Sequence, residues 1–385
     1  MDICKHNADC GGCIYQETPY EDQMALKAKT VQRLVEEKGA FPRRFLGVEG
    51  SPQRYGYRNK MEYTFGDEVK DGEMTLGMHK KGRFMSIITV DECQLAPPDF
   101  NKILRATLDF CTDRGYNFYH KKAHKGLLRN LVLRCGVNTG ELLVNIVTTS
   151  QGEFDGQAYV KCLEALDLDH ELAGTLQTYN DGLSDAVNCD RLKILKGRDY
   201  YMEEIMGLKF KVSAFSFFQT NVAAVEKLYA EAISFIDDVE GKVVFDLYCG
   251  TGTIAQSLAL RAKEAIGVEI VEEAVEAARE NAARNGLKNC KFIAGDVLAV
   301  LDSLEERPDV IVVDPPRAGI HPKALQKILN YGVEQILYIS CNPKSLAENL
   351  EMMKFAGYTV DTLKVFDNFP FTKHVETAVL LVRKP

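Results

Sequence analysis

From about residue 214 onward, short apolar stretches alternate with helical patterns, and this alternation constrains the fold more than any other feature of the chain. The expected strands are 243–247, 265–268, 291–293, 310–313 and 335–339. Helical patterns separate each strand from the next, which is typical of a parallel sheet covered by helices on both faces. Two further strand-like runs, 358–366 and 376–382, predict an antiparallel pair that closes the sheet. We therefore expect an α/β domain with a seven-stranded, doubly wound sheet.

The chain before this domain divides into three regions. Residues 1–21 form a cysteine motif, and residues 22–53 contain a helical pattern that ends near Gly39. Residues 54–210 mix short β-rich pieces with two helical patterns, which predicts an α+β domain. The α/β domain then spans residues 211–385.

Composition excludes several classes of protein. Lys and Arg total 47 against 55 Asp and Glu, so contacts with nucleic acid must come from local basic surfaces rather than from an overall positive charge. The apolar runs are far shorter than the roughly 20 residues that a membrane span needs. The polar, cysteine-containing start does not resemble a secretory signal. We expect a cytoplasmic protein without membrane contact that acts as a monomer.

A glycine-containing loop follows the strand at 243–247 and predicts a nucleotide site. Gly250, Gly252 and Ala255 also fit the fingerprint of dinucleotide-binding proteins, so the loop alone leaves two cofactors open. Asp246 favours S-adenosylmethionine, because its carboxylate would crowd a pyrophosphate but suits a cation. We therefore expect a class I, Rossmann-like methyltransferase domain.

Two acidic residues end the next two strands and complete the expected donor site. Glu269 suits a ribose diol, because a carboxylate accepts two hydroxyl hydrogen bonds. Asp296 is placed to meet the adenine amino group. The alternative for each residue taken singly is a solvated strand end.

Cys341 follows the strand at 335–339 at a turn into a helix, where we expect the helix N-terminus to lower the pKa of its thiol. A thiolate that adds to C6 of uracil makes C5 nucleophilic enough to accept a methyl group. A base must then remove the proton from C5. Glu376 is the first candidate for that base and His374 the second.

With these residues in place, the chain resembles the RNA uridine-5-methyltransferase family over nearly its whole length. Five motifs carry the resemblance, namely SFFQTN at 216–221, DLYCGTG at 246–252, DPPR at 314–317, ISCNP at 339–343 and HVETA at 374–378. The resemblance implies that residues 22–53 pack with the catalytic domain and that the chain lacks the family's TRAM module. Thr253 departs from the Asn that is frequent in the family's loop.

The resemblance also implies roles for individual residues. Cys341 would be the nucleophile and Glu376 the base. The donor site would be lined by Gln219, Tyr248, Glu269 and Asp314.

Cys4, Cys10, Cys13 and the distant Cys93 provide four thiolates. Such a set fits either tetrahedral zinc or an iron–sulfur cluster, and a tight trio with one distant cysteine favours the cluster. The resemblance agrees, because ribosomal members of the family carry a [4Fe-4S] cluster on a similar motif. We expect the cluster to be structural, since the methylation needs no electron.

Residues 114–134 contain six Lys or Arg and no acidic residue, which predicts a strip that faces RNA. Residues 54–60 and 79–83 are two further basic candidates. Because the cysteine motif is similar to that of the family's ribosomal members, the resemblance implies 23S ribosomal RNA as the substrate, either naked or in a partly assembled subunit. The alternatives are transfer RNA, methylation of an exocyclic amine through the DPPR motif, and a non-catalytic iron–sulfur RNA-binding protein that keeps the fold.

Overall fold

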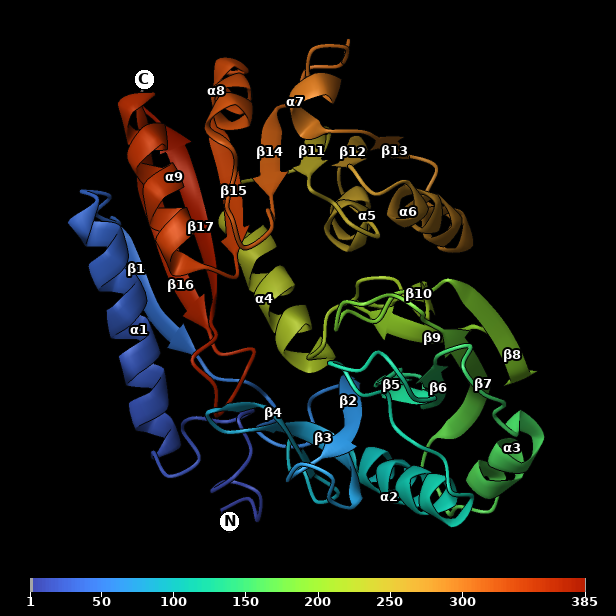
Figure 1. Cartoon of the computed structure of the whole chain (residues 1–385). Coiled ribbons are helices and arrows are strands. Elements are labelled where there is room, and N and C mark those ends of the chain that lie inside the picture. The colour runs from blue at the N-terminus through green and yellow to red at the C-terminus, as the bar shows by residue number, and fades with distance from the viewer. Residues whose placement is uncertain (1–2, 385) are drawn as a thin grey trace. The chain divides into compact units, whose positions relative to one another are not determined.

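The computed structural model describes residues 3–384 and divides the chain into two compact units (Figure 1). Unit 1 contains the residues up to 17 together with 53–204 and 211–215. Unit 2 contains residues 18–52, 205–210 and 216 onward. A two-stranded ribbon of β9 (Tyr200–Ile205) and β10 (Leu208–Ser213) carries the chain from one unit to the other.

Unit 1 is built on a seven-stranded sheet in the order β4-β3-β2-β5-β6-β7-β8. Its elements are β2 (Lys60–Asp67), β3 (Met74–Lys80), β4 (Arg83–Thr89), α2 (Pro98–Asp113), β5 (Leu128–Cys135), β6 (Glu141–Thr148), α3 (Gly156–Glu164), β7 (Glu171–Tyr179) and β8 (Arg191–Gly197). Neighbouring strands are antiparallel except β6 and β7, which α3 connects as a parallel crossover. Apolar side chains of α2 and α3 pack with alternate residues of the strands, such as Leu131 and Val144. Because side chains alternate along a strand, the intervening residues lie on the opposite face of the sheet.

The N-terminal segment of unit 1 lies along the hairpin of β3 and β4. Cys10 forms an isolated antiparallel bridge with Lys80. The Lys81 backbone N–H donates to the carbonyl of Asp9 at 2.6 Å. These backbone contacts hold the cysteine-rich segment on the unit that also contains Cys93.

Unit 2 is built on an eight-stranded sheet in the order β1-β16-β17-β15-β14-β11-β12-β13. Its elements are α1 (Tyr20–Glu37), β1 (Arg44–Glu49), α4 (Val222–Phe235), β11 (Val243–Leu247), α5 (Thr253–Ala259), β12 (Glu264–Glu269), α6 (Glu272–Arg284), β13 (Cys290–Ala294), α7 (Val297–Val300), β14 (Val310–Val313), α8 (Pro322–Asn330), β15 (Gln335–Ser340), α9 (Pro343–Phe355), β16 (Tyr358–Phe366) and β17 (Glu376–Arg383). The five strands from β11 to β15 run parallel, and β17 is antiparallel to both of its neighbours.

The predicted seven-stranded sheet is wrong by one strand. β1 pairs in parallel with β16 and adds an eighth strand at the edge. Its sequence, RFLGVE, contains a glycine and leaves Leu46 47% exposed, so it lacks the apolar run by which the other strands were identified. α1 precedes this strand and buries Val31 and Val35 in the core of unit 2.

β11 lies between β12 and β14. The strand order therefore continues through β12 and β13 on one side of β11 and through β14 and β15 on the other. A sheet of this kind has a crevice at the carboxyl ends of its strands where the direction changes, and ligands bind there. The residues that follow β11, β12, β14 and β15 therefore lie where a ligand is expected to bind.

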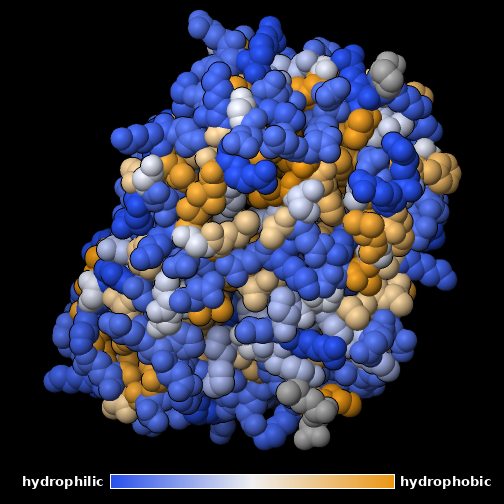
Figure 2. All heavy atoms as spheres, turned by 180° about the vertical axis from the view of Figure 1, so that it is seen from behind, coloured by the Kyte–Doolittle hydropathy of each residue, from blue (hydrophilic) through white to orange (hydrophobic). Residues whose placement is uncertain are grey.

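None of the helices in residues 3–384 is both long and apolar enough to cross a bilayer. On the face drawn in Figure 2, hydrophobic side chains form several separate patches within a largely hydrophilic surface.

Candidate functional site

The loop after β11 adopts left-handed backbone conformations at three residues. Tyr248, Gly250 and Gly252 have φ angles of 69°, 53° and 78°. A Cβ on Gly252 would lie 2.6 Å from the ring of Phe292, so the turn into α5 requires glycine there. A tyrosine with positive φ is unusual, and such strain is concentrated at functional sites.

Asp246 is fully buried at the end of β11. Its Oδ2 accepts a hydrogen bond from the backbone of Ala255 at 2.8 Å, whereas its Oδ1 is buried without a partner among the described residues. Burial, together with the nearby Asp314 and Glu269, raises the pKa of this carboxyl to about 8. A cation placed beside Asp246 would relieve this desolvation, which fits the chemistry predicted for it.

Glu269 ends β12 and holds the glycine loop in place. Its two carboxylate oxygens accept from the backbone N–H groups of Gly250 at 3.1 Å and Val271 at 3.0 Å. Each carboxylate oxygen has a second lone pair, so the predicted contact with a ribose remains compatible with this arrangement.

Asp296 lies beyond β13 as the N-cap of α7, where its side chain accepts from Leu298 N at 2.9 Å. Asp296 is exposed. Burial raises the pKa of the Tyr248 phenol to about 12, and the charge of the nearby Asp296 makes a smaller contribution in the same direction. The structure therefore brings Asp296 and Tyr248 together at the same loop, while the predicted contact with adenine stays a prediction.

Gln219 lies in the loop before α4 and donates from Nε2 to the hydroxyl of Tyr229 at 3.0 Å. Tyr229 is buried, and burial followed by the charge of Asp314 raises its pKa well above the usual value. Asp314 itself follows β14, and burial raises the pKa of its carboxyl to about 7. Gln219 and Asp314, which are separated by almost a hundred residues in sequence, thus meet around one buried tyrosine.

Cys341 directly follows β15, and Glu376 begins the neighbouring strand β17. β15 and β17 are antiparallel with Ser340 opposite Thr377, so the next pair along the ladder brings Cys341 to the level of Glu376. Glu376 is 9% exposed, and burial followed by the charge of Asp314 raises its pKa well above the usual value. The nucleophile and the base predicted from sequence are therefore adjacent.

The expected low pKa of the Cys341 thiol is wrong for the ligand-free protein. Burial raises it to about 11, and the charges of Glu376 and Asp314 add to the effect. Arg317 acts in the opposite direction, because its guanidinium lowers the pKa of both Cys341 and Glu376. Desolvation and two carboxylates thus outweigh any stabilisation from the N-terminus of α9.

Sequence reasoning missed how the DPPR and ISCNP motifs are joined. Asn342 is the N-cap of α9, where its Oδ1 accepts from Lys344 N, and its Nδ2 donates to the carbonyl of Arg317 at 2.7 Å. Arg317 also contacts the Nδ1 atom of His374 at 2.7 Å. An Asn directly before a predicted helix is a capping signal, and it was the available hint of this role.

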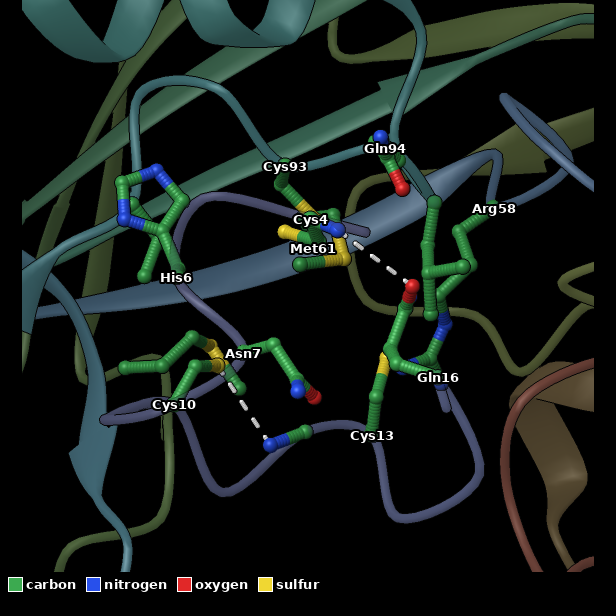
Figure 3. Close-up of a pocket in the computed structure, with 14 residues that line it drawn as sticks. Cys4, His6, Asn7, Cys10, Cys13, Gln16, Arg58, Met61, Cys93 and Gln94 are labelled. Atoms are coloured by element: carbon green, nitrogen blue, oxygen red, sulfur yellow. Dashed lines mark hydrogen bonds between the residues drawn. The ribbon is translucent and has the colours of Figure 1, made fainter. Parts of the chain in front are cut away.

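The four predicted cluster ligands line one pocket in unit 1 (Figure 3). In Figure 3 Cys4 and Cys93 lie on one side of this pocket, opposite Cys10 and Cys13. Burial, with a smaller contribution from the other three cysteines, raises the pKa of the Cys13 thiol to about 11. Within residues 3–384, no group of three or more His, Cys, Asp or Glu side chains is arranged to hold a single metal ion.

The basic strip predicted at 114–134 is wrong in part. Arg129 and Arg134 are only 6% and 3% exposed. The guanidinium of Arg129 donates to three backbone carbonyls between residues 180 and 184, and Arg114 forms an ion pair with Asp155 at 3.2 Å. The strip spans β5, whose residues are all buried, so these arginines stabilise the unit instead of forming a continuous basic surface.

The comparisons with protein families agree with this geometry. The family model described as tRNA (Uracil-5-)-methyltransferase matches residues 296–384, which contain Asp314, Cys341 and Glu376. A general methyltransferase domain model matches residues 244–331, which contain the glycine loop.

Relatives of nearly the same extent are also found. An uncharacterised RNA methyltransferase of Clostridium tetani is 49% identical over 381 residues, covering 99% of this chain and 84% of the relative. Another from Caldanaerobacter subterraneus is 49% identical over 378 residues, covering 98% of this chain and 84% of the relative. The crystal structure of Pyrococcus abyssi tRNA (uracil-54, C5)-methyltransferase in complex with S-adenosyl-L-homocysteine matches with a TM-score of 0.80 and 28% identity, covering 97% of this chain and 85% of that one.

Proposed function

We propose that this chain, which belongs to the RNA uracil-5-methyltransferase family, transfers a methyl group from S-adenosylmethionine to C5 of a uridine in RNA by covalent catalysis through Cys341. One observation carries the covalent route. Cys341, the nucleophile, directly follows β15, and the buried carboxyl of Glu376 begins its antiparallel neighbour β17 at the crevice of the sheet. A methyltransferase that acts on an amine nitrogen has no need of this pair.

The chemistry assigns a separate task to each residue. The Cys341 thiol gives up its proton to solvent, and its sulfur forms a bond to C6 of the uracil, which moves the electron pair of the C5–C6 double bond toward C5. S-adenosylmethionine would supply an electrophilic methyl group to that carbon and leave as S-adenosylhomocysteine. Glu376 then accepts the proton from C5, the C6–S bond breaks, and the ring regains its double bond.

Two features of the site suit these steps. Because the Cys341 thiol has a pKa of about 11, it is protonated in the free protein, and the Arg317 guanidinium favours the thiolate when the substrate enters. Because burial makes the Glu376 carboxylate a stronger base than an exposed one, it is suited to remove a proton from carbon.

For the donor, we propose the acidic cluster around the glycine loop, in which Asp246 is buried and Glu269 and Asp314 are half-buried. Asp246 and Asp314 would face the cationic end, and Glu269 the ribose. Gln219, Tyr248 and Asp296 complete the proposed set. The Pyrococcus abyssi relative was crystallised with S-adenosyl-L-homocysteine, which supports a donor of this kind.

We also propose a [4Fe-4S] cluster on Cys4, Cys10, Cys13 and Cys93. The four thiols share one pocket, which supports this assignment. The lack of a single-ion site among the described residues is compatible with it, because each thiolate of a cubane ligates a different iron and the four sulfurs need not converge on one point. Its role would be to fix the N-terminal segment on unit 1.

The cluster prediction is checked by anaerobic reconstitution with iron and sulfide. We expect about four irons for the wild type and loss of the characteristic absorbance in Cys93→Ser. Cys189→Ser is the matched control, because Cys189 is an exposed cysteine of the same unit outside the pocket. Equal iron content in both variants would contradict the assignment.

For the substrate, we propose 23S ribosomal RNA. The cysteine motif supports it, because it resembles the motif of the family's ribosomal members. Transfer RNA is the competing substrate, and the Pyrococcus abyssi structure, that of a transfer RNA enzyme, is the observation that favours it. Nucleoside mass spectrometry of 5-methyluridine in each RNA pool of a deletion strain, complemented with wild type or Cys341→Ala, distinguishes the two.

The covalent mechanism is tested on RNA that contains 5-fluorouridine. The fluorine on C5 cannot leave as a proton does, so the wild type should form a stable protein–RNA adduct. Cys341→Ala should form none and lose at least about a thousandfold in methyl transfer, as expected for removal of a nucleophile. Cys189→Ala serves as the control. Methyl transfer that survives in Cys341→Ala would rule out this mechanism, and donor binding without turnover on any RNA would indicate a non-catalytic RNA-binding protein.

A further inference from the structure

Unit 1 has a second pocket, on the face of its sheet that α2 and α3 do not cover. Three strands contribute to it, with Lys60 and Glu62 from β2, Val132 and Arg134 from β5, and Asn145 from β6. Register places Lys60 opposite Arg134, and Glu62 opposite Val132, which in turn is opposite Asn145. Val187, Ala214 and Phe215 complete the lining.

Asn145 shows that this pocket is suited to a polar ligand. The side chain is 2% exposed, and its Oδ1 accepts a hydrogen bond from the Thr178 hydroxyl at 2.9 Å. Asn145 lines the pocket, and its amide nitrogen Nδ2 is buried without a hydrogen-bond partner among residues 3–384. A buried donor without an acceptor is unfavourable, so a ligand that accepts from it is favoured.

The rest of the polar lining combines donors with an acceptor. Lys60 forms an ion pair with Glu62 at 2.6 Å, and the two side chains remain 30% and 45% exposed. Arg134 is 3% exposed, and its pKa is lowered by burial despite the opposing effects of the Tyr201 hydroxyl and Glu62. One edge of the pocket therefore offers N–H groups and a carboxylate side by side.

The other walls are apolar. Val132 is 4% exposed, whereas the ring of Phe215 is 40% exposed and available for stacking. Aromatic rings beside a polar edge are the usual means by which proteins bind unpaired bases of RNA, with stacking on the ring face and hydrogen bonds to the base edge. A lone phosphate fits less well, since Glu62 would repel it and the apolar wall would have no partner.

We propose that this pocket binds an unpaired nucleobase of the substrate RNA, at a nucleotide other than the uridine that is methylated. The inference rests on the proposed function, because it takes RNA as the substrate. Asn145 would donate to a ring nitrogen or carbonyl of the base, Glu62 would accept from an amino or imino group, and Phe215 would stack. The pocket then contributes to the choice of RNA site, separately from the chemistry at Cys341.

The test is an abasic scan of the unpaired nucleotides in a substrate RNA, with affinity and methyl transfer measured at each position. An abasic nucleotide keeps its phosphate and loses only the base. For the wild type, we expect one position besides the target uridine where the abasic change weakens RNA binding by roughly tenfold to a hundredfold. Asn145→Leu removes the donor at similar volume. We expect this variant to bind intact RNA as weakly as the wild type binds the abasic RNA, and to lose no further affinity when the base at that position is removed.

Two controls keep the outcome clear. Asn330→Leu makes the same change at an exposed end of α8 and should leave the scan unchanged. If Asn145→Leu is unstable on melting, Glu62→Gln replaces it, since Glu62 is partly exposed and should tolerate substitution.

The inference is overturned if no abasic position other than the target weakens binding, or if the loss at that position is unchanged in both pocket variants. Failure of the proposed function is a separate result, in which the wild type binds RNA without methylating it. The affinity scan still decides the role of the pocket in that case.

Discussion

Unit 2 buries charged side chains in two regions that differ in how the charge is balanced. In the crevice of the sheet, Asp246 and Glu376 are buried and Asp314 is half-buried, and the carboxyls of all three have raised pKa values. Elsewhere, Lys27 of α1 donates to Asp367 at 2.6 Å, and the two side chains are 3% and 0% exposed. The second region supplies its own counter-charge. Among the described residues the first has only the exposed Arg317 beside Glu376, and this difference distinguishes a site suited to a cationic ligand from a contact that holds the fold together.

The balanced pair also supports the site indirectly. Lys27 donates a second hydrogen bond to the carbonyl of Phe369 at 3.1 Å, and Gln23 on the same helix accepts from the backbone of Phe371 at 3.0 Å. These contacts fix the loop that leads from β16 into Glu376 at the start of β17. The N-terminal helix therefore positions the segment that carries the proposed base.

The largest effect should come from changing the base in the crevice. Glu376→Gln keeps the size of the side chain but cannot accept the C5 proton, so we expect turnover to fall by roughly 10²- to 10⁴-fold, the usual contribution of a general base. Because methyl transfer precedes proton removal, the methylated RNA should stay attached to Cys341. Gel analysis of radiolabelled RNA in denaturant measures that adduct.

Glu231→Gln provides the matched control, because Glu231 on α4 forms an ion pair with Lys364 and is not among the proposed site residues. We expect it to turn over normally and to accumulate no adduct. Full activity in Glu376→Gln would show that another group, such as His374, removes the proton.

A smaller effect, measured as stability, is expected from breaking the balanced pair. Lys27→Met leaves Asp367 buried without its counter-charge and should lower the free energy of unfolding by about 3–5 kcal/mol. Chemical denaturation measures this. On the same helix, Arg33→Met removes an exposed pair with Glu37, whose side chains are 58% and 55% exposed, and should cost less than about 0.5 kcal/mol.

The double variant with Lys27→Met and Asp367→Leu sharpens the test. Replacing both charges with apolar side chains should recover most of the lost stability, because the cost arises from the unpaired charge. If Lys27→Met is no more costly than Arg33→Met, the pair is not the structural contact described here.

The sequence predicted the parts of the fold and site that depend on local patterns. Apolar runs located β11, β14 and β16 to the residue. Their order also predicted that residues after parallel strands, among them Asp314 and Cys341, would share one edge of the sheet. No comparable pattern marks β1, whose edge position leaves it half exposed.

Features that depend on distant partners could not be predicted in this way. Lys27 and Asp367 are 340 residues apart, and neither has a neighbour in sequence that indicates a buried pair. The raised pKa of Cys341 arises from burial near two carboxyls, that of Asp314 after β14 and that of Glu376 at the start of β17, which a helix-terminus argument does not include. Arg129 and Arg134 are basic in sequence but buried in a strand, so counting charges overestimated the exposed basic surface.

The smallest predicted effect is a pH dependence of donor binding in the unbalanced region. In the free protein the pKa of Asp314 is about 7 and that of Asp246 about 8, each raised chiefly by burial. A bound sulfonium would lower both values, so binding releases protons wherever these carboxyls are still protonated. Affinity for S-adenosylmethionine should therefore rise with pH up to about 8 and fall roughly tenfold between pH 8 and pH 6 if one carboxyl must ionise.

S-adenosylhomocysteine separates the charge from the rest of the ligand, because its sulfur is a neutral thioether. Its affinity, measured by calorimetry over the same pH range, should change much less than that of S-adenosylmethionine. Asp314→Asn removes the carboxyl with a pKa near 7 and should flatten the profile between pH 6 and pH 7 for the sulfonium ligand. If both ligands show the same pH dependence in the wild type, the carboxyls respond to a part of the ligand other than the sulfonium. The sulfonium would then not be the counter-charge of the crevice carboxyls in the way that Lys27 is the counter-charge of Asp367.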